Sequence, residues 1–371
     1  MLTRLDDYPV HQTPEPLAHP SGNHPNTYDR YFFHGYDLAA GVMFGVALGV
    51  YPVRGVIDAS FTVVRDGVQR SVHASARAPR ERTSTTVGPI RVEVVEPMRR
   101  HRVVVDAPDL GIVADLELTA RTEPHEEPRQ TSRDGIVVLM DSTRLTQWGT
   151  WHGTLSVDDA PVGVDGLLGA RDRSWGIRPV GAAAPGPPAT VLPQFFWLWS
   201  PVHLGDRALH FQIQEHADGR RSQWGGAILP FLDDPDTEPF TGPAAEPAAG
   251  VSWDIEWEPG TRRARSASFT IERWNADPVR VDLVPRLTLL MRGLGYVDPE
   301  WGQGHWRGDD ATGTRSWVVA DEDPLDVRNL HVQHLCEVRV GEQTGVGAFE
   351  ILAIGEHQPS GLTGFLDGAG G

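Results

Sequence analysis

The residues best suited to acid–base chemistry lie in GARDRSWG (169–176), where Asp172 stands between two arginines. Neighbouring side chains of a β-strand point to opposite faces, so Arg171 and Arg173 would point away from the face that carries the acid. A carboxyl group that is removed from water has a raised pKa and can donate a proton near neutral pH. A buried carboxylate is more commonly ion-paired, so the same cluster could instead clamp two domains together. The stretch therefore predicts either a catalytic acid at Asp172 or a structural ion-pair network.

Tryptophans gather on both sides of this stretch and could form the walls of a cavity around the acid. A buried indole needs a partner for its N–H group, so a Trp cluster is typical of a packing seam or of a ligand-binding wall. The sequence leaves both interpretations open. The candidate ligand-binding tryptophans are Trp148, Trp151, Trp175, Trp197 and Trp199.

Polar side chains alternate with apolar ones in LHFQIQEH (209–216), which places His210 and Gln212 on one face of a strand. His331 lies in a similar alternating segment. One interpretation is a solvated outer face. The other is a barrel lumen whose apolar wall carries a few hydrogen-bonding groups for a ligand, which makes these three residues candidate ligand-binding residues. A histidine could also position or deprotonate a water molecule, and His152 is the candidate catalytic partner of the acid.

Several chemistries are excluded by what the sequence lacks. The chain contains no lysine, which excludes Schiff-base catalysis and a P-loop. The single cysteine, Cys336, excludes a disulfide framework and a Cys-rich metal site. His331 and His334 form H-x-x-H, but on a strand these side chains point to opposite faces and cannot chelate one metal ion. Neither a GxSxG elbow nor a GxGxxG fingerprint is present. We therefore expect neither a metal nor a cofactor.

The elements that would position these residues are β-strands. The 40 Gly and 30 Pro residues argue against long helices, and short β-branched runs separated by turn residues recur along the chain. The Pro- and Ala-rich segment 180–193 has the composition of a linker. The sequence thus predicts an all-β protein with few short helices and two domains, residues 1–183 and 184–371. Each domain has the size of a closed barrel or a sandwich.

Charge and hydropathy indicate the surroundings of the protein. The formal net charge of −17 favours a soluble protein and argues against a nucleic-acid partner. The N-terminal segment lacks the apolar core of a signal peptide. The most apolar stretch, 31–52, contains His34, Asp37 and several glycines, and we interpret it as buried strand and not as a membrane span. We expect a cytoplasmic protein, and the sequence does not indicate its oligomeric state.

GARDRSWG resembles the D-H-x-W-G signature of the carotenoid 1,2-hydratase (hydroxyneurosporene synthase) family and its AttH-like relatives. The segment GVGAFEILAIGEHQPSG (345–361) is similar to the C-terminal end of an actinobacterial branch of these proteins. The resemblance implies two tandem lipocalin-like (calycin) β-barrels and a lipophilic substrate of isoprenoid or polyketide type. Asp172 matches the acid that protonates the alkene, and Trp175 with the following glycine matches the rest of the signature. The chain departs from the signature at Arg173, where the family has His, and at Ala170, where a Tyr is expected.

These patterns lead to two functional hypotheses. The first is a cofactor-free acid–base enzyme, either a lyase of hydratase or dehydratase type or an isomerase or cyclase. It would act on an isoprenoid-, steroid- or polyketide-like molecule in an aromatic-lined cavity. The second is a protein that binds or carries a lipophilic ligand without catalysis, with the Arg-Asp-Arg cluster as an interdomain clamp. Loss of turnover without loss of stability on replacing Asp172 would favour the enzyme.

Overall fold

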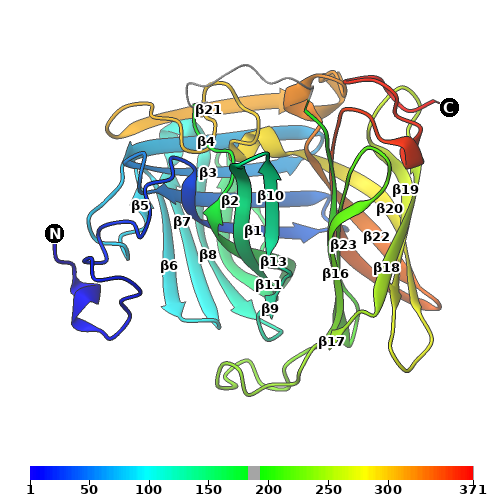
Figure 1. The fold of residues 1–371 in the computed structure, drawn as a ribbon, viewed down its shortest axis with the longest axis horizontal. Helices are drawn as coiled ribbons and strands as arrows, with labels where there is room; N and C mark the ends of the chain where they lie inside the picture. Colours follow the sequence, from blue (N-terminus) through cyan, green and yellow to red (C-terminus); the bar gives the residue numbers. More distant parts are fainter. Residues whose placement is uncertain (183–192, 371) are drawn as a thin grey trace.

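The computed structural model describes residues 1–182 and 193–370. Within these residues the regular structure consists of antiparallel β-strands and a few short 3₁₀ helices, with no α-helix. The strands form two sheets, a 14-stranded one and a 9-stranded one. Each sheet curls around its own apolar core, and the two stand side by side (Figure 1). The prediction of an all-β protein is confirmed.

The first sheet comes mainly from the N-terminal half of the chain. Its main strands lie in the order β21-β4-β3-β2-β1-β13-β11-β8-β7-β6-β5, and β5 contacts β3 and β4 across the curled sheet. Buried rings such as Phe33, Phe44 and Trp151 help to fill the space inside. The strands are β1 (Thr27–Asp37), β2 (Val42–Tyr51), β3 (Val56–Arg65), β4 (Val68–Arg77), β5 (Thr86–Val87), β6 (Ile90–Glu96), β7 (Arg100–Ala107), β8 (Ile112–Ala120), β9 (His125–Glu126), β10 (Gln130–Asp134), β11 (Val137–Val157), β12 (Ala160–Val162), β13 (Leu167–Ile177) and β21 (Ala311–Val318).

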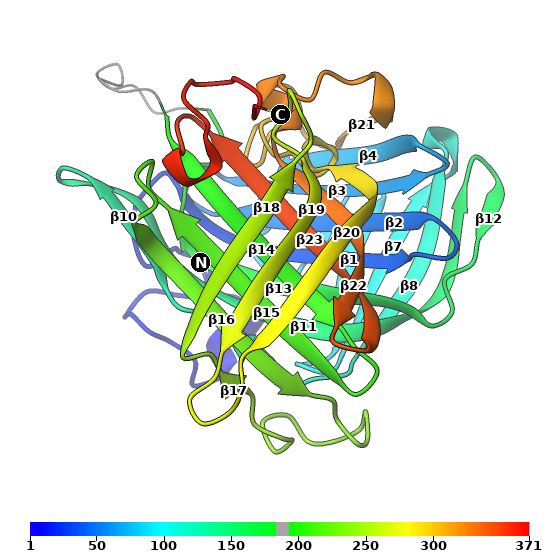
Figure 2. The same ribbon diagram turned by 90° about the vertical axis from the view of Figure 1, so that its right-hand side faces the viewer.

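The second sheet comes from the C-terminal half of the chain and curls in the same way. Its strands lie in the order β17-β16-β15-β14-β23-β22-β20-β19-β18, and β16 contacts β18 (Figure 2). Phe211 and Phe269 stack inside it with ring centres 4.7 Å apart, and the lone Cys336 is buried in the same core. The strands are β14 (Phe195–His203), β15 (Arg207–Glu215), β16 (Arg221–Pro230), β17 (Glu246–Pro247), β18 (Gly250–Trp257), β19 (Ala264–Glu272), β20 (Val279–Leu290), β22 (Val332–Val340) and β23 (Gln343–Ile354).

One segment of the C-terminal half crosses to the first sheet. After β20 the chain leaves the second sheet, and β21 pairs with β4 from Ala311↔Ser75 to Val318↔Val68 before the chain returns to β22. The first sheet therefore contains a strand from the second half of the sequence. The boundary predicted between residues 183 and 184 lies outside the described residues. The 3₁₀ helices are η1 (Arg4–Asp7), η2 (Pro108–Leu110), η3 (Met291–Leu294), η4 (Val319–Asp321), η5 (Val327–Asn329) and η6 (Gln358–Ser360).

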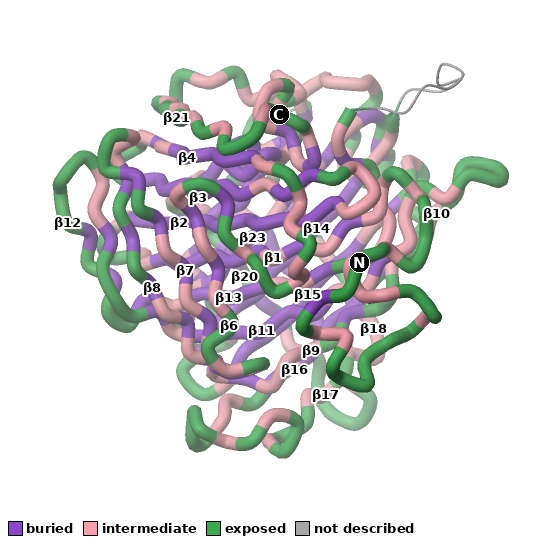
Figure 3. The backbone as a smooth tube through the Cα atoms, turned by 90° about the vertical axis from the view of Figure 1, so that its left-hand side faces the viewer, coloured by how far each residue is buried: buried purple, intermediate pink, exposed green. Residues whose placement is uncertain are grey.

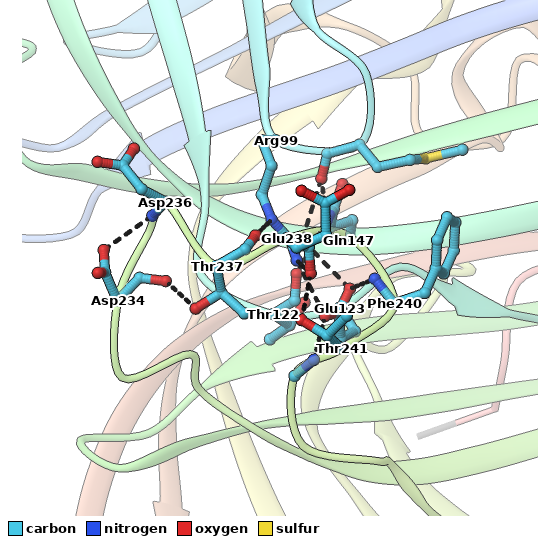
Figure 4. Close-up of polar contacts among 12 residues, drawn as sticks. Arg99, Thr122, Glu123, Gln147, Asp234, Asp236, Thr237, Glu238, Phe240 and Thr241 are labelled. Carbon is cyan, nitrogen blue, oxygen red and sulfur yellow. Dashed lines mark hydrogen bonds and ion pairs between the residues drawn. The ribbon is translucent and has the colours of Figure 1, made fainter.

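The loop between β16 and β17 also reaches the first sheet. The buried Arg99 donates a hydrogen bond of 2.5 Å to the carbonyl oxygen of Thr237 and pairs with Glu123 at 2.9 Å (Figure 4). Glu123 in turn accepts a hydrogen bond of 3.0 Å from the backbone N–H of Phe240. An ion pair at the end of the first sheet thus holds this loop by its backbone.

The outer faces of the two sheets pack against each other along their central strands. Phe32 on β1 meets Trp199 on β14 edge to face, with ring centres 6.5 Å apart. Two residues further along β1, His34 Nδ1 lies 3.1 Å from Gln333 Oε1 on β22. Because both faces of these strands are covered, buried residues concentrate at the centre of the molecule (Figure 3).

The apolar stretch 31–52 forms β1 and β2, so its interpretation as buried strand is confirmed. Every residue of β2 is buried, which explains the uniform hydrophobicity of this segment. Among the described residues, no helix has the length and apolar character needed to cross a membrane.

Candidate functional site

Asp172 lies in the face that the first sheet turns toward the second. β13 pairs with β1 on one side and β11 on the other, so that Asp172 stands between Phe32 and Thr146. Directly paired residues of neighbouring strands share a face. Asp172 therefore points, with Phe32, toward β14 of the second sheet.

The two arginines beside Asp172 point to the opposite face of the strand. Arg171 donates from Nε to Gln147 Oε1 at 2.9 Å, and Arg173 pairs with Asp29. Within residues 1–182 and 193–370, Asp172 takes part in no ion pair, and its Oδ1 is buried without a hydrogen-bond partner. The hypothesis of an interdomain clamp required arginines to hold this carboxyl group, and that arrangement is not found in the described part of the chain.

A small cavity with a volume of about 50 Å³ lies beside Asp172 and has walls from both sheets. This volume suits a few water molecules or one small chemical group. The lining contains three carboxylates and two guanidinium groups, so it is more polar than the aromatic-lined cavity predicted from the sequence. The lining residues are Tyr28, Phe32, Glu127, Pro128, Gln130, Met140, Ser142, Arg144, Asp172, Ser174, Arg178, Trp199, Gln223, Tyr296 and Glu350.

The environment of Asp172 favours its neutral form. Burial raises the pKa of its carboxyl group from 3.8 to about 6, because the charged form loses hydration. The positive charge of Arg144 opposes this shift, and the negative charge of Glu127 adds to it. At pH 7 about a tenth of the Asp172 side chains therefore still carry a proton, and about half do so at pH 6.

Glu127 is fully buried and differs from Asp172 in having many partners. Arg144 donates from Nε to Glu127 Oε2 at 2.5 Å, while Thr146 Oγ1 and Trp199 Nε1 donate to Oε1 at 2.5 and 3.2 Å. His210 Nε2 lies 3.3 Å from the same oxygen. Burial alone would raise the pKa of Glu127, but these partners hold it well below its usual range.

Glu350 on β23 is the third carboxylate of the cavity, and it is also held by hydrogen bonds. Its Oε1 lies 3.0 Å from His331 Nε2 and accepts a hydrogen bond of 3.1 Å from Trp197 Nε1. Its Oε2 accepts a hydrogen bond of 2.6 Å from Gln333 Nε2. Burial would raise the pKa of Glu350, but His331 and Gln333 lower it overall. The cavity thus combines one carboxyl group with a raised pKa and two with lowered pKa values, which is the pattern of an acid beside stabilising anions.

Five of the ligand-binding residues predicted from the sequence gather around this cavity. Gln212 Oε1 accepts a hydrogen bond of 2.7 Å from Arg144. The strand containing Gln212 turns its polar face toward the first sheet and not into a barrel lumen, because the alternate residues Phe211 and Ile213 fill the core of the second sheet. Alternation in the sequence identified the two faces of this strand, but it did not show that the apolar face is the one that enters the core of the second sheet. The five residues are Trp197, Trp199, His210, Gln212 and His331.

The remaining predicted residues lie elsewhere. His152 is exposed and stands six residues beyond Thr146 on β11, roughly 20 Å away at the rise of an extended strand. It therefore does not join Asp172 as a catalytic partner. Trp151 donates from Nε1 to the carbonyl oxygen of His34 at 2.9 Å, within the core of the first sheet. Trp175 is 41% exposed and does not line the cavity.

Trp148 is buried, with its ring centre 6.0 Å from that of His210, but it does not line the cavity. Its indole N–H has no hydrogen-bond partner in the described part of the chain. Of the five tryptophans, only Trp199 lines the cavity, so four of the predicted wall residues are not wall residues. Alternation along one strand cannot determine which of two packed cores a ring enters.

Sequence reasoning missed several residues of the site. Glu350 had a signal, since it is a single charge inside the apolar run AFEILAI. Arg144 lies on a strand, but nothing in its sequence surroundings marked it as buried. Glu127 and Tyr296 follow segments rich in turn residues, which gave no indication that their side chains are buried. Arg178 follows directly after β13 and showed no pattern of its own. These residues meet only because the two sheets pack together.

Comparison with known proteins assigns the chain to a family. The model described as "Family of unknown function (DUF8625)" matches residues 2–363, which is almost the whole chain. The chain belongs to this DUF8625 family. No curated protein matches the DUF8625 chain.

Two solved structures are similar to this DUF8625 chain. A putative AttH from Nitrosomonas europaea has 14% sequence identity and a TM-score of 0.49, and the match covers 92% of this chain and 98% of that chain. Kievitone hydratase from Nectria haematococca has 10% identity and a TM-score of 0.48, covering 95% of this chain and 96% of that chain. Because both identities and both TM-scores are low, the function has to be argued from the site itself.

Proposed function

We propose that this protein is an acid–base enzyme in which Asp172 protonates a small lipophilic molecule bound between the two sheets. The carboxyl group of Asp172 carries the proposal. It faces a cavity, its pKa is raised to about 6, and the described residues provide no ion-pair partner for it. A carboxyl group that only stabilises a fold is normally paired, whereas a general acid works best with a pKa near the working pH.

The reaction that this arrangement suits is addition of water to a carbon–carbon double bond, or its reverse. The proton of Asp172 adds to one alkene carbon and leaves a positive charge on the other. Water adds at the charged carbon and then returns one proton to the Asp172 carboxylate, so the acid is regenerated. If the substrate cation loses a different proton, the same steps give an isomerase. The ring of Trp199 and the anions Glu127 and Glu350 would stabilise the positive charge.

A lipophilic substrate is supported by the hairpin of β10 and β11, which borders the cavity. Gln130 and Met140 of this hairpin line the cavity, and Ile136 at its tip is 94% exposed. Val137 beside it is also exposed. Apolar side chains exposed on an element that also lines a site can receive the outer part of an apolar ligand. The cavity of about 50 Å³ holds only the reacting group of an isoprenoid-, steroid- or polyketide-like molecule, so the rest of the substrate would lie along this hairpin.

Deuterium incorporation from heavy water tests the proposal. Native protein, Asp172→Asn and the surface control Asp165→Asn are incubated with isoprenoid, steroid and polyketide alkenes and their hydrated alcohols. We expect native protein and the control to label or interconvert at least one pair, with a rate that falls as the pH rises above about 6. Asp172→Asn should lose about 10²-fold or more in rate while binding the same molecule with similar affinity.

Equal labelling by native protein and Asp172→Asn would contradict the proposal. Binding of a lipophile without labelling by any of the three proteins would identify the second candidate, a non-catalytic carrier.

A further inference from the structure

Two arginines near the cavity, Arg178 in its lining and Arg30 behind Tyr296, lack a carboxylate partner in the described part of the chain. Arg30 is 2% exposed, and it donates to the hydroxyl of Tyr296 at 2.5 Å and to the carbonyl oxygen of Leu294 at 3.3 Å. Arg178 lines the cavity and donates to Gln303 Oε1. All of these acceptors are neutral, and the two guanidinium groups lie 4.6 and 5.7 Å from the ring centre of the same residue, Tyr296. Two positive charges therefore stand near each other without an ion-pair partner among the described residues.

Aromatic rings hold both guanidinium groups in place. The guanidinium of Arg178 lies 4.5 Å from the ring centre of Tyr28, and that of Arg30 lies 4.6 Å from the ring centre of Tyr296. Stacking on a ring occupies the flat face of a guanidinium and leaves the N–H groups at its edge able to donate. The Nε atoms of both arginines are buried, and the described residues offer them no acceptor. This geometry suits planar recognition of an anionic oxygen pair.

The carboxyl groups nearest to these arginines are engaged elsewhere or point to the acid site. Asp58 accepts a hydrogen bond of 3.2 Å from the Tyr51 hydroxyl and one of 2.5 Å from the backbone N–H of Gly304. Glu127 and Glu350 are held by the partners described above. Asp172 lies near enough to feel the charge of both arginines but forms no ion pair with either among the described residues, and in the protonated form that the catalytic proposal requires it supplies no counter-charge. Buried charges are normally paired, so this cavity has a place for one anionic group.

We propose that Arg178, supported by the charge of Arg30, binds a carboxylate of the substrate, and that the substrate is therefore a lipophilic carboxylic acid. The proposal rests on the proposed function for the reaction at Asp172, but the binding step itself does not require turnover. The carboxylate would lie at the Arg178 side of the small polar cavity, directly next to the reacting double bond at Asp172, and the apolar chain would extend along the β10–β11 hairpin. Long-range electrostatic attraction between the protein and an anion does not explain such binding, because the protein as a whole carries a formal net charge of −17.

The test compares isoprenoid acids with their uncharged esters. Geranic, farnesoic and retinoic acid and their methyl esters are titrated into native protein, and dissociation constants are measured by calorimetry. We expect at least one acid to bind about tenfold or more tightly than its ester, because a hydrogen bond to a charged group contributes about that factor. The proposal is overturned if acids and esters bind equally, or if neither binds.

Two variants assign the preference to Arg178. Arg178→Met should abolish the difference between acid and ester, whereas Arg265→Met, which removes an exposed arginine of the second sheet, should leave it unchanged. Gln303→Glu serves if Arg178→Met does not fold, because it places a carboxylate on Arg178 and should abolish the preference without removing the arginine. Persistence of the acid preference in a folded Arg178→Met or Gln303→Glu protein would overturn the assignment.

Asp172→Asn distinguishes failure of this proposal from failure of the proposed function. If acid binding is as proposed, Asp172→Asn retains the preference for the acid even though it cannot transfer a proton. If native protein shows turnover of an uncharged alkene but no acid preference, the catalytic proposal stands and the carboxylate site is excluded.

Discussion

At the scale of single residues, the account depends on one carboxyl group that is kept apart from the cations around it. Asp172 is flanked in sequence by Arg171 and Arg173, yet strand alternation turns both to the other face. Glu127, in contrast, collects Arg144 and three further donors on the same cavity wall. The difference in partners, and not in residue type, makes one carboxyl group an acid and the other a fixed anion.

Asp172→Asn should make the protein more stable at neutral pH. The pKa of Asp172 is raised in the folded state from 3.8 to about 6, so the folded protein binds more protons than the unfolded chain between about pH 4 and pH 6. Its free energy of unfolding therefore falls as the pH rises through this window, by about 3 kcal/mol at most. Asparagine stays neutral and avoids this cost.

The stability prediction is checked by urea unfolding of native protein, Asp172→Asn and Asp165→Asn at about pH 3.5 and pH 7.5. We expect the curves to agree at the lower pH and Asp172→Asn to be more stable at the higher one. The pKa of Asp58 is also raised to about 6 by burial, but this shift is common to all three proteins and cancels in the comparison. A less stable Asp172→Asn protein at pH 7.5 would indicate a structural role for the carboxylate.

At the scale of elements, five strands make the site, and one of them, β11, also belongs to a hairpin. β1, β13 and β11 place Phe32, Asp172 and Thr146 in one row, and β14 and β23 supply Trp199 and Glu350 from the other sheet. The β10–β11 hairpin adds a wall whose apolar tip lies in solvent. This hairpin is the element with which we expect a lipophilic substrate to make its outer contacts.

Ile136→Ser should weaken binding of a lipophile about fivefold. Serine lacks most of the apolar surface with which the isoleucine side chain would contact the ligand. The melting temperature should not change, since Ile136 is 94% exposed in the free protein. The matched control is Val95→Ser, which removes an exposed apolar side chain from β6. The measurement is the dissociation constant of the tightest-binding isoprenoid acid or ester, compared between native protein and the two variants. If both variants lose the same affinity for the ligand, or if neither loses affinity, the substrate does not contact the hairpin.

At the scale of the whole molecule, the two sheets are not independent units. β21 joins the first sheet although it follows β20 of the second, and the loop held by Arg99 and Glu123 makes a further connection. The central strands of the first sheet also bury one face against the second sheet. A fragment with residues 1–182 would therefore expose an apolar face and the unpaired edge of β4.

We expect this fragment, expressed alone, to be aggregated or to lack a cooperative thermal transition, because exposed strand edges and apolar faces promote association. Expression together with residues 183–371 should restore a soluble complex. Size-exclusion chromatography and circular dichroism distinguish the outcomes. A monomeric fragment 1–182 with a sharp unfolding transition would show that the first sheet needs neither β21 nor the second sheet.

The sequence predicted the strands well and their assembly poorly. Alternation and turn residues indicated an all-β chain, the buried strand at 31–52 and the two faces of β13, since these depend on local periods. The separation of Asp172 from Arg171 and Arg173 followed from the same alternation. The meeting of Glu127, Glu350 and Arg178 did not, because it depends on how two sheets pack. For the same reason His152 was assigned to a site that lies roughly 20 Å away along its own strand.

The central claim is that Asp172 is a carboxyl group that keeps its proton close to neutral pH between the two sheets. The most direct measurement is the infrared difference spectrum between native protein and Asp172→Asn, recorded across a pH titration. We predict a carbonyl band of a protonated carboxylic acid that disappears with a midpoint near pH 6. A midpoint below about pH 4, the ordinary range of an exposed aspartate, would contradict the account.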